Sequence, residues 1–329
     1  MPANLTPDYL AAEARFRAAV TTEEKLAALD EMYATIPKHK GTEKLRADIK
    51  RRVSKLRDKE KQSGRGKHTD AFHVEKQGAG QVVLLGLPNS GRLMLLSRLT
   101  SAEPEIAKYP YTTRAPMPGM MEFEDVAIQL VDTPPMFGEH TEGGVVSLAR
   151  NADSVALVLD ASDNALLDQI EEIREETAKS RTVLTGARSP EADLAPGVVP
   201  RPTVLVANKI DLDGAAENLE VLDEVYAGEF DVYPVSARTG EGLEGLRRGL
   251  YDSLGIIRVY TKIPGKPPDL ARPFTLVKGS TLIDFAAAVH KDFVHHLRFA
   301  RAWGKHHLDG TRIGHDHVLE DGDVVELHE

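Results

Sequence analysis

The chain has 329 residues, a formal net charge of −10 and no cysteine. This composition excludes disulfides and thiolate metal sites, and the length allows two or three domains with substantial cores. No stretch approaches membrane-spanning length, and the first residues lack the apolar core of a signal peptide, so we expect a cytoplasmic protein without a membrane partner.

Basic residues gather in residues 1–70, a region whose pattern predicts a helical arm. Between Lys38 and His68, 13 Lys or Arg residues face four acids, so this stretch carries +9 and the rest of the chain −19. An acidic body with one basic arm is typical of a protein that docks on a polyanion. A basic helix that folds against its own acidic body is the alternative.

The third helix expected in the arm has one apolar stripe, formed by Leu45, Ile49, Val53 and Leu56. We expect this stripe to be buried, which leaves the basic side chains of the helix turned toward solvent. The candidate contacts to RNA phosphates are Lys44, Arg51, Arg52, Lys55 and Lys59.

Residues 71–255 alternate strand and helix patterns, which predicts an α/β fold with a mostly parallel sheet and helices on both faces. The apolar runs that we expect to be strands are 82–85, 127–131, 154–159, 203–207 and 232–235. Helices are expected at 164–178 and 241–254. The segment 180–201 contains three prolines and is interpreted as an extended surface loop.

The first expected strand runs into a glycine-framed turn and a helix, which is the order of elements in a phosphate-binding P-loop. The predicted loop, whose backbone N–H groups would surround phosphate oxygens, contains Gly86, Pro88, Asn89, Ser90 and Gly91. Arg92 and Leu93 stand where the motif G-x-x-x-x-G-K-[ST] has its Lys and its Mg²⁺-binding hydroxyl. Alone, such a turn also occurs for packing reasons. The sequence therefore keeps the phosphate-binding loop, while the catalytic side chains that follow it are replaced.

Two later segments resemble the switch elements of a guanine-nucleotide switch. Residues 109–113 are a candidate first switch, in which Thr113 would close over Mg²⁺ and the γ-phosphate. Asp132 ends an expected strand and matches the Asp of D-x-x-G, which holds a Mg²⁺-bound water. Together with Arg92, these two residues are the candidate catalytic set.

Two further segments predict a guanine pocket. Asn208, Lys209 and Asp211 match N-K-x-D, in which the carboxylate accepts two hydrogen bonds that guanine offers and adenine does not. The loop that would lie over guanine O6 is the S-A-K-like run Ser236, Ala237 and Arg238. An N-K-x-D motif after a strand, downstream of a P-loop and upstream of this run, predicts a GTPase domain.

The pattern changes in residues 256–329, where expected strands surround one helix and predict a small α+β domain. The strands are expected at 257–262, 274–277, 297–303 and 323–327, and the helix begins with the capping box at 281–284. Eight of the 12 histidines lie here, but without cysteine a metal site is the weaker interpretation. Trp303 is interpreted as a strand-packing residue rather than a base-stacking one.

With these motifs in hand, the chain resembles the Obg-like GTPases, most closely the developmentally regulated GTP-binding proteins. The resemblance spans nearly the whole length and includes residues 36–45, 86–91 and 109–113; residues from 257 onward resemble a TGS domain, a ubiquitin-like β-grasp module. It implies binding of GTP and GDP, association with ribosomes or RNA, and K⁺-assisted hydrolysis, for which Asn89 would match a K⁺ ligand. Met136 fits a group that lacks a catalytic Gln.

Three departures from the family pattern shape the expected function. Arg92 cannot replace a compact ammonium without rearrangement, Leu93 removes a Mg²⁺ ligand, and Pro135 has no N–H to give to a γ-phosphate. Because phosphoryl transfer depends on Lys and metal, we expect weakened Mg²⁺ binding and deficient hydrolysis.

We therefore expect a guanine-nucleotide-binding, translation-linked factor on the ribosome or a structured RNA. An accessory protein is a further candidate partner, and DNA is not expected. One alternative is a slow GTPase that still turns over, and another is an RNA-binding scaffold that works without nucleotide.

Overall fold

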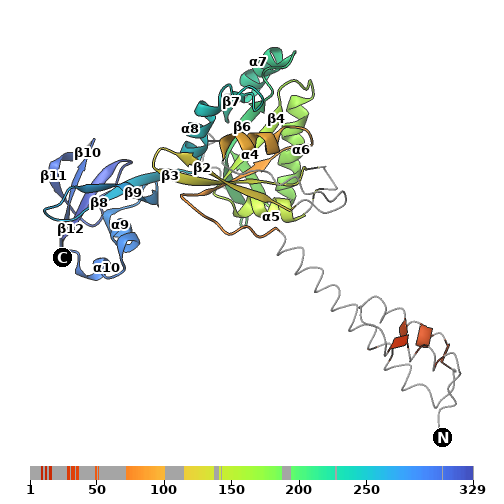
Figure 1. The fold of residues 1–329 in the computed structure, drawn as a ribbon, viewed down its shortest axis with the longest axis horizontal. Coiled ribbons are helices and arrows are strands. Elements are labelled where there is room, and N and C mark those ends of the chain that lie inside the picture. The colour runs from red at the N-terminus through yellow and green to blue at the C-terminus, as the bar shows by residue number, and fades with distance from the viewer. Residues whose placement is uncertain are drawn as a thin grey trace, which may run out of the picture. The chain divides into compact units, whose positions relative to one another are not determined.

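The computed structural model divides the chain into two compact units, Met1–Ala71 and Phe72–Glu329 (Figure 1). The residues that the structure describes are 72–100, 115–136, 141, 143–186, 194–226, 228–305 and 307–328, with 9, 12, 15, 16, 28, 29, 31–33, 35, 36, 49 and 51 from the first unit. Each unit is described by itself.

The described residues of the first unit are almost all helical and share a small apolar core. Ile49, from the predicted stripe, is 2% exposed in this core, and Arg51 is exposed two residues later. The other stripe residues and the other four candidate RNA contacts lie outside the described residues. The buried members of the core are Tyr9, Ala12, Leu29, Met32, Ile36 and Ile49.

The larger sheet of the second unit has the strand order β2-β3-β1-β4-β6-β5, and β7 also pairs with β6. Its pairings are parallel except for β2 with β3, so the predicted mostly parallel sheet is confirmed. The strands are β1 (Gln81–Leu85), β2 (Met117–Phe123), β3 (Val126–Asp132), β4 (Ser154–Asp160), β5 (Thr182–Thr185), β6 (Val199–Asn208) and β7 (Asp231–Val235).

Helices cover both faces of this sheet, and successive residues of β1 show how. Val83 and Leu85 pack into the core beneath α5, α6 and α7, whereas Val82 and Leu84 pack into the core beneath α4 and α8. Both sets are buried because side chains alternate across a strand, so a run without polar residues marks a strand covered on both sides. The helices are α4 (Arg92–Leu99), α5 (Gly143–Asn151), α6 (Leu166–Lys179), α7 (Ala215–Tyr226) and α8 (Leu243–Ser253).

Two parts of this sheet differ from the sequence prediction. The segment 180–201 is not wholly a loop, because β5 and the start of β6 form within it and pair in parallel. Val199 donates its N–H to Arg181 O over 2.9 Å. Prolines 200 and 202 alternate with residues that keep an N–H, so pairing with β5 survives them. Strand β2 was not predicted because its sequence includes Pro118 and Gly119.

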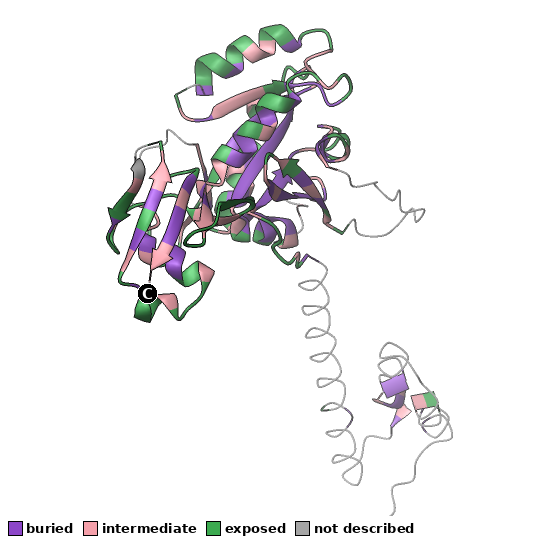
Figure 2. Cartoon of the chain, turned by 60° about the vertical axis from the view of Figure 1, so that its left-hand side comes forward, coloured by how far each residue is buried: buried purple, intermediate pink, exposed green. Residues whose placement is uncertain are grey.

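The smaller sheet has the order β11-β10-β12-β8-β9, and its strands β8 and β10 alternate between buried and more exposed residues (Figure 2). Its core lies between the sheet and α9, which opens with the predicted capping box: Asp284 accepts the Thr281 N–H over 2.8 Å. Strand β11 was not predicted. The elements are β8 (Ile256–Lys262), β9 (Pro268–Val277), α9 (Leu282–Val289), α10 (Phe293–His296), β10 (Phe299–Gly304), β11 (His307–Ile313) and β12 (Asp323–His328).

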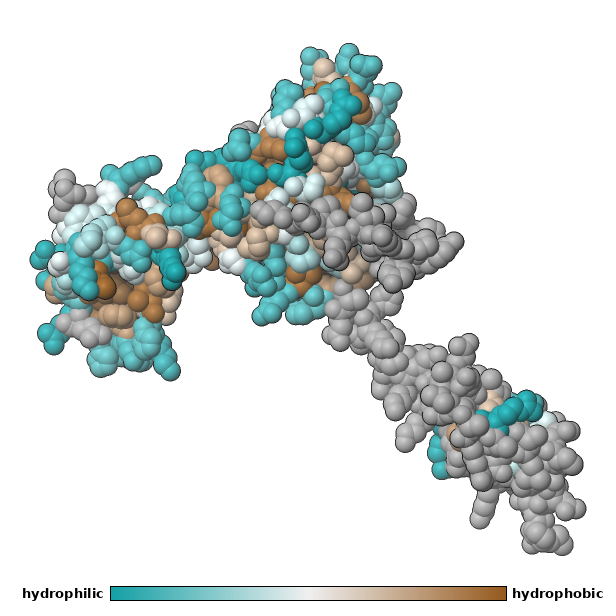
Figure 3. All heavy atoms as spheres, in the orientation of Figure 1, coloured by the Kyte–Doolittle hydropathy of each residue, from teal (hydrophilic) through white to brown (hydrophobic). Residues whose placement is uncertain are grey.

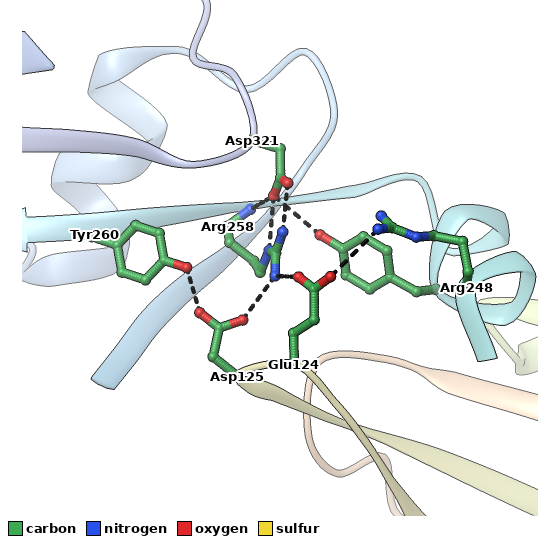
Figure 4. A network of polar contacts seen from close by, with 7 residues as sticks. Glu124, Asp125, Arg248, Arg258, Tyr260 and Asp321 are labelled. Carbon is green, nitrogen blue, oxygen red and sulfur yellow. Dashed lines mark hydrogen bonds and ion pairs between the residues drawn. The ribbon is translucent and has the colours of Figure 1, made fainter. Parts of the chain in front are cut away.

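Arg258 joins the two sheets through the turn between β2 and β3 (Figure 4). Its guanidinium pairs with Glu124, with Asp125 over 2.9 Å and with Asp321 over 2.8 Å. The Tyr260 hydroxyl also donates to Asp125, and burial together with this bond raises the pKa of Tyr260 to about 12. The contact is therefore made of charge-assisted bonds between a largely buried guanidinium and carboxylates that stay partly exposed.

The described surface of the second unit is mostly hydrophilic, with smaller hydrophobic areas between (Figure 3). Within the described part of the chain, no helix is both long enough and apolar enough to pass through a membrane.

Candidate nucleotide-binding site

The predicted motifs meet at one edge of the larger sheet, where parallel strands end. The P-loop follows β1, Asp132 ends β3 and Asn208 ends β6. The carboxyl ends of parallel strands are where open α/β sheets bind ligands. The fold thus brings together residues that are more than 100 positions apart.

Two glycines of the loop are required by close backbone approach. A Cβ on Gly86 would lie 2.4 Å from Val158 O, and a Cβ on Gly91 would lie 2.3 Å from the side-chain nitrogen of Asn208. Gly91 also has φ 91° at the N-cap of α4, a conformation that favours glycine. The loop therefore fits only with glycine at both ends, as its sequence predicted.

Asn208 fastens the loop to the predicted base pocket. Its Nδ2 donates to Ser90 O over 2.8 Å, and its Oδ1 accepts the Ala237 N–H over 3.0 Å. Since Asn208 is only 2% exposed, losing either bond would leave a buried polar group without a partner.

Asp211 lies beside this junction with its carboxylate held from two sides. Oδ1 accepts the Ser236 hydroxyl over 2.5 Å, and Oδ2 pairs with Arg238 over 2.5 Å. The Ser236 bond, together with Arg238, lowers the pKa of Asp211, so the carboxylate is charged at neutral pH. Ionised and close to the loop, it can accept the N–H groups of a guanine base.

Lys209, at φ 69°, turns away from Asp211 and pairs with Asp160 over 2.5 Å. Burial acts to raise the pKa of Asp160, but the bonds from Lys209 and Ser162 outweigh it and hold the pKa below its usual range. The sequence motifs do not include Asp160 among the site residues. Its position near the end of a strand, which is β4 next to β6, is the signal in the sequence that points to it.

Arg92 occupies the phosphate end of the site and is buried, with 7% exposure. Its Nε pairs with Asp132 over 3.0 Å, and Nη2 donates to Thr133 O over 3.2 Å. Nη1 donates to Gly86 O and, over 3.2 Å, to Leu87 O. The guanidinium therefore connects the P-loop to the end of β3. A lysine has one nitrogen instead of three and could not make these bonds to both segments in the same way.

Comparison with known families identifies the two parts of the second unit. Residues 81–187 match the family described as 50S ribosome-binding GTPase, and residues 257–329 match the TGS domain. The chain joins a G domain of this GTPase family to a TGS domain.

Known relatives match over nearly the whole chain. An uncharacterized GTP-binding protein of Methanocaldococcus jannaschii is 29% identical over 93% of this chain and 92% of its own length. Developmentally-regulated G-protein 2 of Arabidopsis thaliana is 28% identical over 92% of this chain and 90% of its own. The solved YchF GTPase of Schizosaccharomyces pombe covers 78% of this chain and all of its own with a TM-score of 0.51; at 14% identity this likeness concerns the fold alone.

The end of β3 is held against the P-loop of the G domain by protein groups. Met136 donates its N–H to Gly86 O over 3.2 Å, and the Thr133 hydroxyl donates to Leu84 O over 2.9 Å. Pro135 between them has no N–H. In this G domain, Asp132 and the segment after it are therefore fixed by the loop and by β1.

The residues of the G domain fit a guanine nucleotide better than they fit Mg²⁺. Ser90 Oγ is buried and has no hydrogen-bond partner among the described residues, so a phosphate oxygen could satisfy it. A metal would have to compete with Arg92 for Asp132, and Leu93 is 40% exposed and offers no oxygen. Within the described ranges, no group of three or more His, Asp or Glu residues is placed to hold a metal ion.

Several predicted site residues have no described contacts with the rest. Thr113 and the first switch lie outside the described residues of the G domain. Asn89 and Pro88 are exposed at the tip of the loop, where Asn89 has φ 64°. The assignment of Asn89 to K⁺ stays a prediction.

Proposed function

We propose that this protein is a guanine-nucleotide-binding, translation-linked factor that associates with the ribosome or a structured RNA and hydrolyses GTP slowly or not at all. The observation that carries the proposal is the bridge from Arg92 to Asp132 beside the assembled residues of the guanine-recognition motifs, Asn208, Asp211 and Ser236. The base pocket supports nucleotide binding, and the bridge argues against efficient chemistry.

The chemical argument concerns where the N–H groups of Arg92 point. A guanidinium has five N–H donors, and four hydrogen bonds to oxygens of described residues use donors on all three nitrogens of Arg92. Phosphoryl transfer needs cationic groups that neutralise charge on the phosphates, and this cation instead faces Asp132 and the loop carbonyls. The expected consequence is slow hydrolysis and weak dependence on Mg²⁺.

The RNA part of the proposal is supported by charge and by the family description. The matched family is named for binding to the 50S ribosome, and residues 38–68 carry +9 against an otherwise acidic chain. Positive charge in one segment supplies affinity for phosphates that does not depend on sequence.

One titration tests the nucleotide part. Labelled GDP and GTP are titrated against the full chain, with Mg²⁺ and with EDTA, while phosphate release is followed in parallel. Binding that EDTA changes little, with no release above background, supports the proposal. Binding that requires Mg²⁺ and is followed by turnover would instead indicate a slow GTPase, and no binding would indicate a scaffold that works without nucleotide.

The arm tests the RNA part. Reversal of Arg51, Arg52 and Lys55 to Glu should flatten the salt dependence of RNA or ribosome binding, and the log–log slope should change by about 0.7–0.9 for each phosphate that is no longer neutralised. GDP affinity is the internal control, because the base pocket belongs to the other unit. Unchanged ribosome co-sedimentation combined with a lower melting temperature would show that the arm instead packs on the acidic body.

A further inference from the structure

We infer that Arg98, which belongs to none of the sequence motifs, is a positioning residue for guanine recognition. Arg98 lies in the last turn of α4, the helix that follows the P-loop, and its side chain holds the guanine loop, residues 236–238. The inference rests on the guanine nucleotide proposed above and names a residue that controls which base the site accepts. Arg98 acts through the loop rather than on the nucleotide.

The contact joins two segments that lie far apart in the sequence. Arg98 Nε donates to Ala237 O over 3.1 Å, and Nη2 donates to Arg238 O over 3.4 Å. Among the described residues, no carboxylate pairs with Arg98, and these two carbonyls are the acceptors of its guanidinium. The loop also leaves room for this side chain, because a Cβ on Gly240 would lie 3.1 Å from Nη2.

The end of α4 does not need Arg98 as its cap. A cation in the last turn of a helix commonly serves the final carbonyls of that same helix. Here Arg247 of α8 does so: its Nη1 donates to Leu99 O over 3.0 Å, and its Nη2 donates to Arg98 O over 3.3 Å. The guanidinium of Arg98 is therefore directed at the guanine loop and not at its own helix.

The guanine loop determines how Asp211 is presented to a base. The hydroxyl of Ser236, a buried residue, donates to Asp211 Oδ1 over 2.5 Å. The carboxylate of Asp211 is the acceptor that we expect for the N1–H and N2–H groups of guanine. Because hydrogen bonds weaken with distance and with misalignment, a displacement of the loop would weaken the contact that distinguishes guanine from other purines.

Ala237 is held on both sides from the P-loop and its helix. Its N–H donates to Asn208 Oδ1 over 3.0 Å, and Asn208 donates in turn to Ser90 O of the P-loop over 2.8 Å. Its carbonyl accepts the hydrogen bond from Arg98. Removal of Arg98 would leave the Asn208 link in place, so we expect the site to keep its nucleotide and to lose selectivity for the base.

The test compares two bases that differ at a group Asp211 would contact. Hypoxanthine lacks the 2-amino group of guanine, so the ratio of the Kd for inosine diphosphate to the Kd for GDP measures recognition of that group. In the original chain this ratio should be about ten or more, the scale of a hydrogen bond to a charged group. Arg98→Ala should reduce the ratio about threefold or more, and Arg98→Lys, which can donate to one of the two carbonyls, should lie between.

Arg150 supplies the matched control. It also lies in the last turn of a helix, α5, and its guanidinium donates to loop carbonyls, Ser180 O over 2.8 Å and Gly197 O over 3.0 Å. These contacts lie near the start of β5 and β6, whereas the nucleotide site lies where strands end. Arg150→Ala should therefore leave the ratio unchanged, and circular dichroism should show that both alanine variants are folded.

An unchanged ratio in Arg98→Ala, or an equal fall in Arg150→Ala, would overturn the inference. Either result leaves the proposed function standing, provided that the chain binds GDP. If the original chain binds no guanine nucleotide, the proposed function fails and the inference fails with it.

Discussion

The G-domain site has a base end around Asp211 and a phosphate end around Asp132 and Arg92. Both lie where strands of the larger sheet end, but the two carboxylates differ in the arginine that pairs with them. At the base end, Asp211 accepts a hydrogen bond from Ser236 and pairs with an exposed arginine. At the phosphate end, Asp132 is paired with a buried arginine that also holds the P-loop. Both carboxylates are paired within the protein, but the arginine that pairs with Asp211 is exposed and the arginine that pairs with Asp132 is buried.

The two Arg–Asp pairs make this difference measurable. The side chain of Arg238 is 66% exposed, so a ligand can displace it readily, whereas that of Arg92 is 8% exposed and makes four hydrogen bonds. At the position where a P-loop motif has its lysine, this chain therefore has an arginine that is bonded to the loop and to Asp132.

The largest expected effect is on stability. Arg92→Ala would remove the cation that pairs with Asp132 near the P-loop carbonyls, and breaking a buried pair in this way costs about 3–5 kcal/mol. Urea denaturation followed by circular dichroism measures it, with Arg238→Ala as the control that should leave the midpoint unchanged. Equal, small shifts in both variants would remove the distinction between the two ends.

The next effect is on nucleotide affinity at the base end. Asp211→Asn should weaken GDP binding roughly tenfold to a hundredfold, the scale of a hydrogen bond to a charged group, and should favour xanthine nucleotides. Isothermal titration with GDP and XDP checks both, and adenine nucleotides serve as the negative control. A variant that binds GDP as before would mean that the base lies elsewhere.

A smaller effect should appear when the phosphate end is rebuilt. Arg92→Lys combined with Leu93→Ser restores a compact ammonium and a hydroxyl, and frees Asp132 from its guanidinium partner. EDTA should then lower GDP affinity by about tenfold or more, which is about 1.4 kcal/mol, a dependence that we expect the original chain to lack. If the original chain already shows this dependence, the bridge does not exclude the metal.

The smallest expected effect is the dependence of GDP affinity on pH. Because the folded pKa of Asp211 is below its ordinary value of 3.8, its ionised form contributes stability above pH 3.8, and this contribution disappears as pH falls through the lower folded value. GDP affinity should therefore stay level from about pH 8 to about pH 5, as fluorescence titration would show. A decline already near neutral pH would indicate a different titrating group.

The sequence was sufficient for the order of motifs but not for the bonds of Arg92. Hydrophobic runs predicted β1, β3 and β4 well, since buried parallel strands have no polar face. The strands β2, β5 and β11 were missed because pairing with a neighbour, rather than their own composition, makes them extended. Likewise, Arg92 could be seen to lack the right shape for a P-loop, but its bridge to Asp132 depends on the fold.

The exposed side of the TGS sheet shows the same limit. The sequence of β10 shows that its side chains point alternately to the two faces of the sheet. Which face is buried depends on where α9 packs. Trp303 was therefore assigned to packing, although its ring lies partly outside the core.

The hairpin of β2 and β3 has a mechanical consequence. Seven cross-strand pairs run from Met117 and Asp132 at the nucleotide end to Phe123 and Val126 at the other, a length of about 20 Å for strands of this size. Just beyond the last pair, Glu124 is held by Arg258 of the TGS domain. One hairpin thus connects the site to the TGS domain. A change of the β2–β3 register at Asp132 would shift the turn at the other end of the hairpin, and the ion pair between Glu124 and Arg258 would have to loosen with it.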